Sequence, residues 1–279
     1  MTDFVALGHV TRDEFEGEPT WRFGGTALYA AATAARLGVD SALVTRVGRS
    51  EATALGDSAS TLGIELHALP SEVTTTFAFR YVEGRRMLRL RARARGLAGT
   101  DLPAGLHSAR AVVLGSVAHE LDRSVFGALG GTATVLVAQG YLREWSADGT
   151  ITPRPWDDAQ ELAPLVSAVV LSEDDVAGDL SAARRWSRHG AVYVTLAERG
   201  VLILRDGAER TVPGFPVARV VDPTGAGDAF AAGLALALAD GKRDVDAARY
   251  ANAVASFAVE GVGMEALADR AAVEKRLRG

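Results

Sequence analysis

Short apolar runs recur along the chain, and each is bounded by glycine, aspartate or other polar residues. Runs of this length and composition are typical of strands that are buried on both faces of a sheet. They lie at Phe4–Leu7, Ser41–Val44, Ala111–Leu114, Thr134–Val137, Ala168–Leu171 and Val192–Leu196. We therefore expect each run to form a central strand.

Several segments between or after these runs have the composition and spacing of helices, and each is followed by a glycine that suits the left-handed position closing a helix. The predicted helices are Thr26–Leu37, Ser181–His189, Ala226–Ala239 and Asp244–Glu260, followed by Gly38, Gly190, Gly241 and Gly261. Strands that alternate with helices form a mostly parallel sheet covered on both faces. The pattern therefore predicts an α/β fold of three layers, with a doubly wound, mostly parallel sheet.

Two segments interrupt this alternation. Residues 11–23 are charged and have no helical period, whereas residues 74–95 show the two-residue alternation of an exposed strand pair, with Phe77 and Phe79 on one side. The arginines of residues 85–95 follow that alternation, as on a solvated strand, although they could also attract an anionic substrate. We predict a single domain over residues 1–279, with a small β lid formed by about 11–23 and 74–95.

Composition restricts the possible partners and surroundings. The 279 residues are 48% hydrophobic and 23% charged, as in ordinary globular proteins, and the formal net charge of -5 disfavours nucleic acid and anionic membranes. The absence of cysteine excludes disulfides and thiolate zinc sites. No apolar stretch is long enough to span a membrane, and the first ten residues do not resemble a signal peptide, so a cytoplasmic location is expected.

The most informative segment is residues 222–230, Asp-Pro-Thr-Gly-Ala-Gly-Asp-Ala-Phe, between an extended stretch and an alanine-rich helix. Gly225 and Gly227 let the backbone approach a ligand closely, and the first turn of the helix directs unpaired amides at that ligand. Asp228 would stand at the edge of this anion hole, where a carboxylate can accept a proton from an attacking hydroxyl. The plainer alternative is a turn followed by a carboxylate that complements the helix dipole.

This segment resembles, nearly residue for residue, the C-terminal signature of the ribokinase-like, phosphofructokinase-B type carbohydrate kinases. The resemblance implies a ribokinase-like fold and an ATP-dependent kinase that uses Mg²⁺, with K⁺ as a further candidate ion. It also implies Asp228 as the catalytic base. By the same resemblance, Gly225, Ala226 and Gly227 form the anion hole, and Asp222 and Thr224 lie near a monovalent cation or the magnesium-bound phosphates.

Other motifs of the same family mark the side that binds the acceptor. Asp13 follows the first strand and resembles the family's substrate-binding aspartate, and Gly24 with Gly25 resembles the N-terminal diglycine. A carboxylate there can accept hydrogen bonds from two hydroxyls, although a solvated turn residue is the plain alternative. Tyr29 stands where sugar kinases of this type usually have asparagine, which suggests stacking against a ring. Gln139 and Arg143 lie where many relatives have Asp-x-Asn-x-Arg, so Arg143 could steer a phosphate or form a surface ion pair.

The predicted binding site for the phosphate donor rests on shorter matches to the family's motifs. Residues 172–175, Ser-Glu-Asp-Asp, occupy the place of an Asn-x-x-Glu motif that helps to organise magnesium, and Asp175 keeps a carboxylate there. Residues 195–200 resemble a Thr-Leu-Gly-x-x-Gly turn with Ala197 replacing a glycine. Thr195, Glu198 and Gly200 are the candidate nucleotide contacts in that turn. Asn252 matches a position that lines the adenine pocket, or is simply the polar residue of a half-buried helix.

These observations predict an ATP-dependent phosphotransferase that acts on a hydroxyl of a small polyhydroxylated substrate. Minor features favour an inositol-like cyclitol first and a nucleoside second, and a homodimer is left open. The alternative from another class is a ligand-binding or regulatory protein that kept the fold and lost catalysis. A dinucleotide dehydrogenase is less favoured than either, because residues 8–11, Gly-His-Val-Thr, cannot form its glycine-rich turn.

Overall fold

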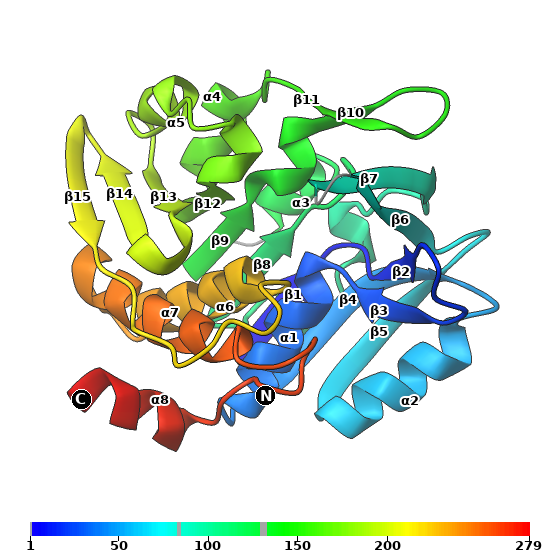
Figure 1. Ribbon diagram of the computed structural model, residues 1–279, viewed down its shortest axis with the longest axis horizontal. Coiled ribbons are helices and arrows are strands. Elements are labelled where there is room, and N and C mark those ends of the chain that lie inside the picture. The colour runs from blue at the N-terminus through cyan, green and yellow to red at the C-terminus, as the bar shows by residue number, and fades with distance from the viewer. Residues whose placement is uncertain (1, 83–84, 129–132) are drawn as a thin grey trace.

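The computed structural model describes residues 2–82, 85–128 and 133–279. Its central element is a nine-stranded sheet with strand order β15-β14-β13-β12-β9-β8-β1-β4-β5 (Figure 1). The strands are β1 (Phe4–Leu7), β4 (Ser41–Gly48), β5 (Ile64–Ser71), β8 (Ala111–Gly115), β9 (Ala133–Val137), β12 (Ala168–Ser172), β13 (Ala191–Thr195), β14 (Val201–Arg205) and β15 (Ala208–Val212). All neighbouring pairs from β13 to β5 are parallel, and β14 and β15 continue the sheet as an antiparallel hairpin.

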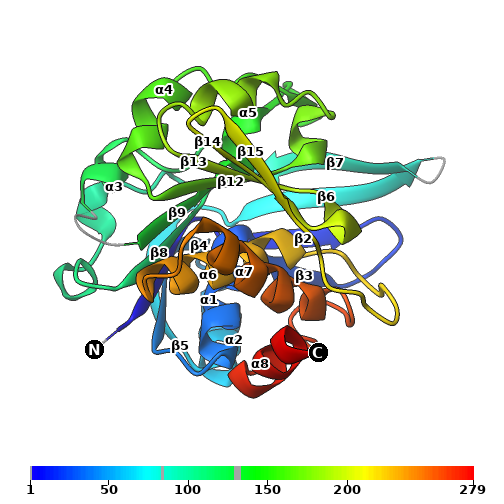
Figure 2. The ribbon, with the colours of Figure 1, turned by 90° about the vertical axis from the view of Figure 1, so that its left-hand side faces the viewer.

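Helices cover both faces of this sheet, because successive strand residues point to opposite sides and both sides are apolar. Phe4 and Ala6 belong to one core and Val5 and Leu7 to the other. The first core lies under α1 (Thr26–Arg36), α2 (Ala52–Leu62), α6 (Ala226–Ala239), α7 (Asp244–Ala258) and α8 (Arg270–Arg278). The second lies under α3 (Ser124–Gly127), α4 (Ala159–Leu162) and α5 (Ser181–Trp186), on the opposite side of the sheet in Figure 2.

The glycines that were predicted to close helices are confirmed at two helix ends and wrong at the other two. Gly38 and Gly241 have the expected left-handed conformation, each with φ of 78°. The prediction was wrong at Gly190, because α5 already ends at Trp186, where the Ser187 hydroxyl bonds back to the Arg184 carbonyl at 2.9 Å. It was also wrong at Gly261, since α7 ends at Ala258. The left-handed glycine of that loop is Gly263.

A separate four-stranded sheet, which we call the lid, stands over one edge of the main sheet (Figure 1). Its order is β3-β2-β6-β7, from strands β2 (Thr11–Phe15), β3 (Trp21–Gly24), β6 (Thr75–Val82) and β7 (Arg85–Ala92). Residues 83–84 of the predicted strand pair lie outside the described residues. The inner face of the lid is apolar, and Phe77, Phe79 and Leu90 pack against Val117 and Ala118 of the body.

A short hairpin of β10 (Arg143–Trp145) and β11 (Ile151–Pro153) packs beside the lid, and β11 contributes Ile151 to the same cluster. The fold class is therefore confirmed as a large, mostly parallel sheet between helices, with a small separate sheet. Among the residues described, no helix is both long enough and apolar enough to cross a membrane.

Candidate active site

The candidate residues gather where the parallel strands end. The carboxyl ends of β1, β8, β9, β12 and β13 share one edge of the sheet, because these strands are mutually parallel. In open α/β sheets, ligands bind in the crevice outside this edge. Helices α1 and α6 pack against each other. Their N-termini meet at this edge, because Thr26, the first residue of α1, lies beside Gly115 at the end of β8 and is hydrogen-bonded to the side chain of Asp228 in α6.

Asp228 has the protonation behaviour that a general base needs. Its side chain is half-buried in the first turn of α6. Burial raises its pKa to about 6, assisted by the charge of Asp175, while the Thr26 hydrogen bond and the charge of Arg143 act in the opposite direction. A carboxylate with this pKa is ionised at neutral pH but holds a proton more readily than an exposed aspartate does.

Two glycines of the predicted anion hole have different structural roles. Gly225 is the residue before α6 and has φ of 83°, and a Cβ placed on it would lie 2.3 Å from Cδ1 of Tyr29. Gly227 is inside the helix, and among the described residues nothing lies within 4 Å of a Cβ placed there. Gly225 is therefore required by backbone conformation and by the aromatic ring beside it, whereas Gly227 leaves open space at the site.

Tyr29 is almost entirely covered, with 6% of its surface exposed. Its pKa is raised by burial and by the charges of Asp228, Asp13 and Asp222, in that order, so the phenol stays protonated among three carboxylates. The ring packs against Gly225, and with 6% of the residue exposed little of its surface is left for the expected stacking on an acceptor. Tyr29 thus lies between the acceptor-side aspartate and the phosphate-side loop.

The loop before α6 is organised by its own side chain. A carboxylate oxygen of Asp222 accepts the backbone amide of Thr224 at 2.9 Å, which forms a tight turn ahead of Gly225. The amides of Val221 and Asp222 reach the carbonyl of Val259, beyond the end of α7, at 2.7 and 3.4 Å. Asp222 and Thr224 therefore sit between α6 and the loop after α7, with side-chain oxygens beside backbone carbonyls.

On the acceptor side, Asp13 lies on β2 of the lid with its carboxylate against the diglycine. The Thr11 hydroxyl donates to Asp13 Oδ1 at 2.7 Å. A Cβ at Gly24 would lie 2.2 Å from Asp13 Oδ2. Gly25 has φ of 98°, and a Cβ there would lie 2.4 Å from the carbonyl oxygen of His9. Any side chain at either glycine would displace the carboxylate or the strand that carries it.

Arg143, Gln139 and Asp175 line the middle of the edge. Arg143 begins β10, and its charge reaches Asp228, whose pKa it lowers. Asp175 lies in the short turn after β12, where Oδ2 accepts the Ser172 amide at 2.8 Å. The amide nitrogen of Gln139 donates weakly to Asp175 Oδ1 at 3.4 Å. The charges of Arg143 and Asp175 thus act on Asp228, and Gln139 contacts Asp175.

The residues predicted to contact the nucleotide lie further along the same edge of the main sheet. The Thr195 hydroxyl reaches the Leu171 carbonyl at 3.4 Å, and Glu198 is exposed in the next turn. Gly200 has φ of 95°, and a Cβ there would lie 2.2 Å from the Val212 carbonyl oxygen. Asn252 is buried, and its amide nitrogen donates to the carbonyls of Val212 and Pro213 at 3.2 and 3.0 Å. Asn252 therefore holds the segment after β15 in place.

The oxygen donors at this edge suit magnesium held through a ligand. In the described part of the chain, no three His, Cys, Asp or Glu side chains form a cluster that could hold a metal ion alone. Magnesium is commonly bound by one or two carboxylates together with phosphate oxygens and water. Asp175 and Asp222 are candidates of this kind, so the residues present fit a metal that arrives with a phosphate donor.

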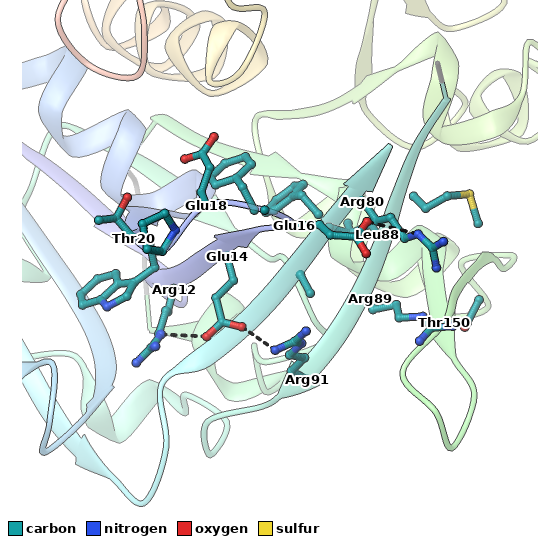
Figure 3. A pocket seen from close by; sticks show the side chains of 17 residues that line it. Arg12, Glu14, Glu16, Glu18, Thr20, Arg80, Leu88, Arg89, Arg91 and Thr150 are labelled. Atoms are coloured by element: carbon teal, nitrogen blue, oxygen red, sulfur yellow. Dashed lines mark hydrogen bonds and ion pairs between the residues drawn. The ribbon is translucent and has the colours of Figure 1, made fainter. Parts of the chain in front are cut away.

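A cavity of about 540 Å³ is lined mostly by lid strands β2, β6 and β7 and by the turn between β2 and β3, and Asp228 is not among its lining residues (Figure 3). Its arginines are paired with carboxylates. Glu14 lies between Arg12 and Arg91 at 3.1 and 2.8 Å, and Arg80 pairs with Glu16 (Figure 3). Because the charges of Arg89 and Arg91 are compensated, these two arginines match a solvated strand better than a site for an anionic substrate.

Comparison with known proteins places this geometry in a family. The sequence pattern of the pfkB family carbohydrate kinases matches residues 15–270. The chain belongs to this family. Its segment around Gly225 and Asp228, its diglycine and its lid are thus parts of a pfkB kinase domain.

Relatives of this pfkB-family chain include inositol kinases and ribokinases. It is 36% identical to inositol 3-kinase of Zea mays over 134 residues, which are 47% of the chain and 35% of that enzyme. It is 44% identical to ribokinase of Bacillus subtilis over 75 residues, or 26% of the chain and 25% of the enzyme. The matched segments therefore span about a third or less of these relatives.

Solved structures match over nearly the whole length. A pyrophosphate-dependent kinase of the ribokinase family, complexed with a pyrophosphate analog and myo-inositol, has a TM-score of 0.81 at 22% identity and covers 97% of this chain and 99% of its own. Ribokinase of Arabidopsis thaliana, complexed with ribose and ATP, has a TM-score of 0.78 at 23% identity, with both chains covered completely. These similarities establish the shared fold.

Sequence reasoning missed two parts of the site. Thr26 is hydrogen-bonded to Asp228, but the sequence pattern predicted it only as the start of a helix. Its position could have indicated a site residue, because its hydroxyl directly follows the diglycine at a helix N-terminus. Phe77 is the register partner of Asp13 in the parallel pair of β2 and β6. No local pattern could have indicated that pairing, because it depends on the lid topology.

Proposed function

We propose that this chain is an ATP-dependent phosphotransferase that phosphorylates a hydroxyl of a neutral polyhydroxylated molecule, with Asp228 as general base. The observation that carries the proposal is the position of Asp228 at the start of α6, bonded to Thr26 and with a pKa raised to about 6. Asp13 and Arg143 from other elements share this edge. A buried carboxylate with a raised pKa is typical of catalytic sites, which favours an enzyme over an inactive binding protein on the same fold.

The acceptor would lie between the lid and the diglycine. The carboxylate of Asp13 accepts hydrogen bonds from hydroxyls and repels an anionic ligand at the same point. Phe77, its register partner on β6, is buried against Val117 and Ala118, so apolar packing rather than another charge borders the carboxylate. These features favour a cyclitol first, then a nucleoside, over a substrate that already carries phosphate.

Phosphoryl transfer would require one proton movement by the protein. The acceptor oxygen forms a bond to the terminal phosphorus as the bond to the donor's bridging oxygen breaks, and the hydroxyl proton passes to a carboxylate oxygen of Asp228. The Gly227 and Asp228 amides belong to the first turn of α6, whose amides have no intrahelical acceptor. Together with the positive end of the helix dipole they would stabilise charge on the phosphoryl oxygens.

Magnesium bound with the nucleotide would supply charge neutralisation on the phosphate oxygens. Asp175 and Asp222 are the residues that would hold it, directly or through water, and Asp222 with Thr224 would border a potassium site. Thr195, Glu198 and Gly200 would border the nucleotide. Asn252 would act indirectly, by holding residues 212–213 against Gly200.

Pyrophosphate is a second candidate donor. Asn252, the residue expected at the adenine, uses its amide nitrogen on two backbone carbonyls and so has less capacity to bind a base. A pyrophosphate donor needs the anion hole and the carboxylates but no base pocket. The nucleotide remains the first candidate, because the family contains enzymes such as a ribokinase complexed with ATP.

The decisive experiment combines both donors with a panel of acceptors. Purified chain is incubated with magnesium and either ATP or pyrophosphate, and with myo-inositol, ribose, inosine, fructose or fructose 6-phosphate, and the products are identified by mass spectrometry. We expect a phosphorylated cyclitol or nucleoside with ATP, and none with Asp228→Asn. Faster phosphorylation of a hexose or of fructose 6-phosphate would overturn the acceptor assignment. Binding without turnover for every pair would favour the regulatory alternative.

A further inference from the structure

A buried histidine joins the lid to the body at the point where the chain passes between them. The chain enters the lid through residues 8–10 and 72–74, and it leaves after β3 through Gly25 and after β7 through residues 93–98. The imidazole of His9, fully buried, lies where the two entering connections and the second exit meet. Its Nδ1 is 2.8 Å from the Thr75 hydroxyl, at the start of β6, and its Nε2 is 2.8 Å from the Arg95 carbonyl.

The hydrogen bonds determine which imidazole nitrogen carries the proton. The Arg95 carbonyl can only accept, so Nε2 carries the hydrogen. Nδ1 then accepts from the Thr75 hydroxyl, whose oxygen in turn accepts the Ala94 amide at 3.0 Å. Every polar atom of this chain of bonds is used in the neutral form. Burial lowers the pKa of His9, while the nearby Glu120 acts in the opposite direction.

The backbone of His9 is held just as firmly. Its amide donates to Glu120 Oε1 at 3.1 Å, and the carboxylate of this buried residue also accepts the amides of Val117 and Ala118. Val117 and Ala118 are the body residues on which the apolar face of the lid packs. The same cluster therefore ties the entrance of the lid to the surface on which the lid rests.

Asp13 is four residues beyond His9 on β2 and has little freedom of its own. One carboxylate oxygen accepts the Thr11 hydroxyl, and the other lies so close to Gly24 that a Cβ there would be 2.2 Å away. A rotation of β2 at its base would consequently move the carboxylate relative to the diglycine. Placement within about 0.5 Å is the tolerance expected of a functional side chain.

We propose that His9 is a positioning residue for acceptor binding, whose neutral imidazole joins three of the four lid connections and so places Asp13 against the diglycine. This inference rests on the proposed function for its effect on the acceptor, although the structural part stands independently. A second tie remains without His9, since the Thr74 hydroxyl donates to Glu51 Oε2 at 2.7 Å. The lid is therefore expected to stay folded in His9 variants while its orientation loosens.

The kinetic test uses His9→Gln, which keeps a donor near Arg95 but loses Nδ1, and His9→Asn, which keeps an acceptor near Thr75. With myo-inositol, or the fastest acceptor of the panel above, we expect the acceptor KM of each variant to rise about tenfold, while kcat changes by less than about threefold. Ser41→Ala is the matched control, because it removes a buried 2.9 Å hydrogen bond to Ala31 at the opposite end of β4. An unchanged acceptor KM in both His9 variants would overturn the proposal.

A double-mutant cycle and amide hydrogen exchange distinguish a positioning role of His9 from a general effect on the stability of the fold. In a double-mutant cycle with Thr75→Val, the combined effect on KM should be clearly smaller than the product of the two single effects, because both changes break the same chain of bonds. Amides of β2 and β6 should exchange faster in His9→Gln, with α6 and α7 unchanged. Independent effects, or uniformly faster exchange over the whole chain, would contradict the proposal. The exchange result holds even if no acceptor in the panel is phosphorylated, so failure of the proposed function is recognised separately.

Discussion

Asp228 is half-buried at the start of α6, and burial raises its pKa to about 6 although the hydrogen bond to Thr26 and the charge of Arg143 lower it. We expect Asp228→Asn to lower kcat by two orders of magnitude or more, the scale of a general base. As the proposed base, Asp228 would act in its ionised form, so kcat/KM of the unsubstituted chain should fall about tenfold per pH unit below about pH 6 and be level above it. Steady-state kinetics between pH 4.5 and 8.5 would measure both effects.

Asp240→Asn is the control, because Asp240 caps the other end of α6 and pairs with Arg110. Its pH profile should match that of the unsubstituted chain. A level profile down to about pH 4.5, or ordinary turnover in Asp228→Asn, would remove Asp228 from the mechanism.

The same carboxylate should destabilise the fold at neutral pH. Its pKa in the folded state exceeds the ordinary value of about 3.9, so the folded state is penalised once the group ionises, with the penalty growing between about pH 4 and 6 and complete above. Asp228→Asn should therefore raise the free energy of unfolding by about 1–2 kcal/mol at pH 8, after discounting for partial exposure, and by much less at pH 4. Urea unfolding at the two pH values tests this, and an equal change at both would contradict it.

Ala197 departs from the family's motif, and its backbone conformation is unfavourable for a residue with a side chain. It stands where the resemblance places a glycine, is exposed, and has φ of 52°. A left-handed conformation costs an L-residue about 1–2 kcal/mol, partly offset by the larger entropy that glycine loses on folding. Ala197→Gly should therefore raise the free energy of unfolding by up to about 1 kcal/mol in urea titrations. A comparable loss of stability would show that the turn does not carry the strain inferred here.

At the scale of the element, the N-terminus of α6 separates two kinds of glycine. Gly225→Ala adds a Cβ into the ring of Tyr29 and requires an unfavourable φ, so we expect a loss of stability of about 2 kcal/mol or more together with a loss of activity. Gly227→Ala meets open space inside a helix, so it should preserve stability or improve it slightly.

Because that open space is where we propose the phosphoryl group, Gly227→Ala should still lower kcat/KM at least tenfold by crowding the anion hole. Thermal unfolding and kinetics on the two variants provide the comparison. Full activity in Gly227→Ala would rule out a ligand at this turn. Full stability in Gly225→Ala would refute the role given to its backbone.

At the scale of the whole molecule, the site exists only because loops from both halves of the chain meet at one sheet edge. Asp175 follows β12 and Asp222 precedes α6, and neither belongs to a metal cluster within the described residues. We therefore expect magnesium to act with the phosphate donor, and excess chelator should abolish turnover while leaving the unfolding temperature of the ligand-free chain unchanged. Activity in excess chelator would refute this, and equal rates in sodium, potassium and a bulky organic cation would remove the potassium site.

Local pattern was sufficient for the elements and for the chemistry of single motifs. The runs at Phe4–Leu7 and Ala168–Leu171 became strands, and the segment before α6 formed a left-handed glycine next to an aspartate, because strand burial and turn conformation depend mainly on nearby residues. The family relationship could be inferred from the same few residues. Charge and composition correctly indicated an ordinary globular chain.

Tertiary structure decided what those motifs contact. Three contacts join residues that are separated by at least 20 positions in the chain. Tyr29 is buried against Gly225, and Asn252 donates to the carbonyls of residues 212–213. His9 lies between Thr75 and Arg95. Such contacts are set by strand order and by the packing of the lid, which no sequence window contains. The pKa of Asp228 belongs to the same category, because it depends on burial and on charges delivered by β10 and by the turn after β12.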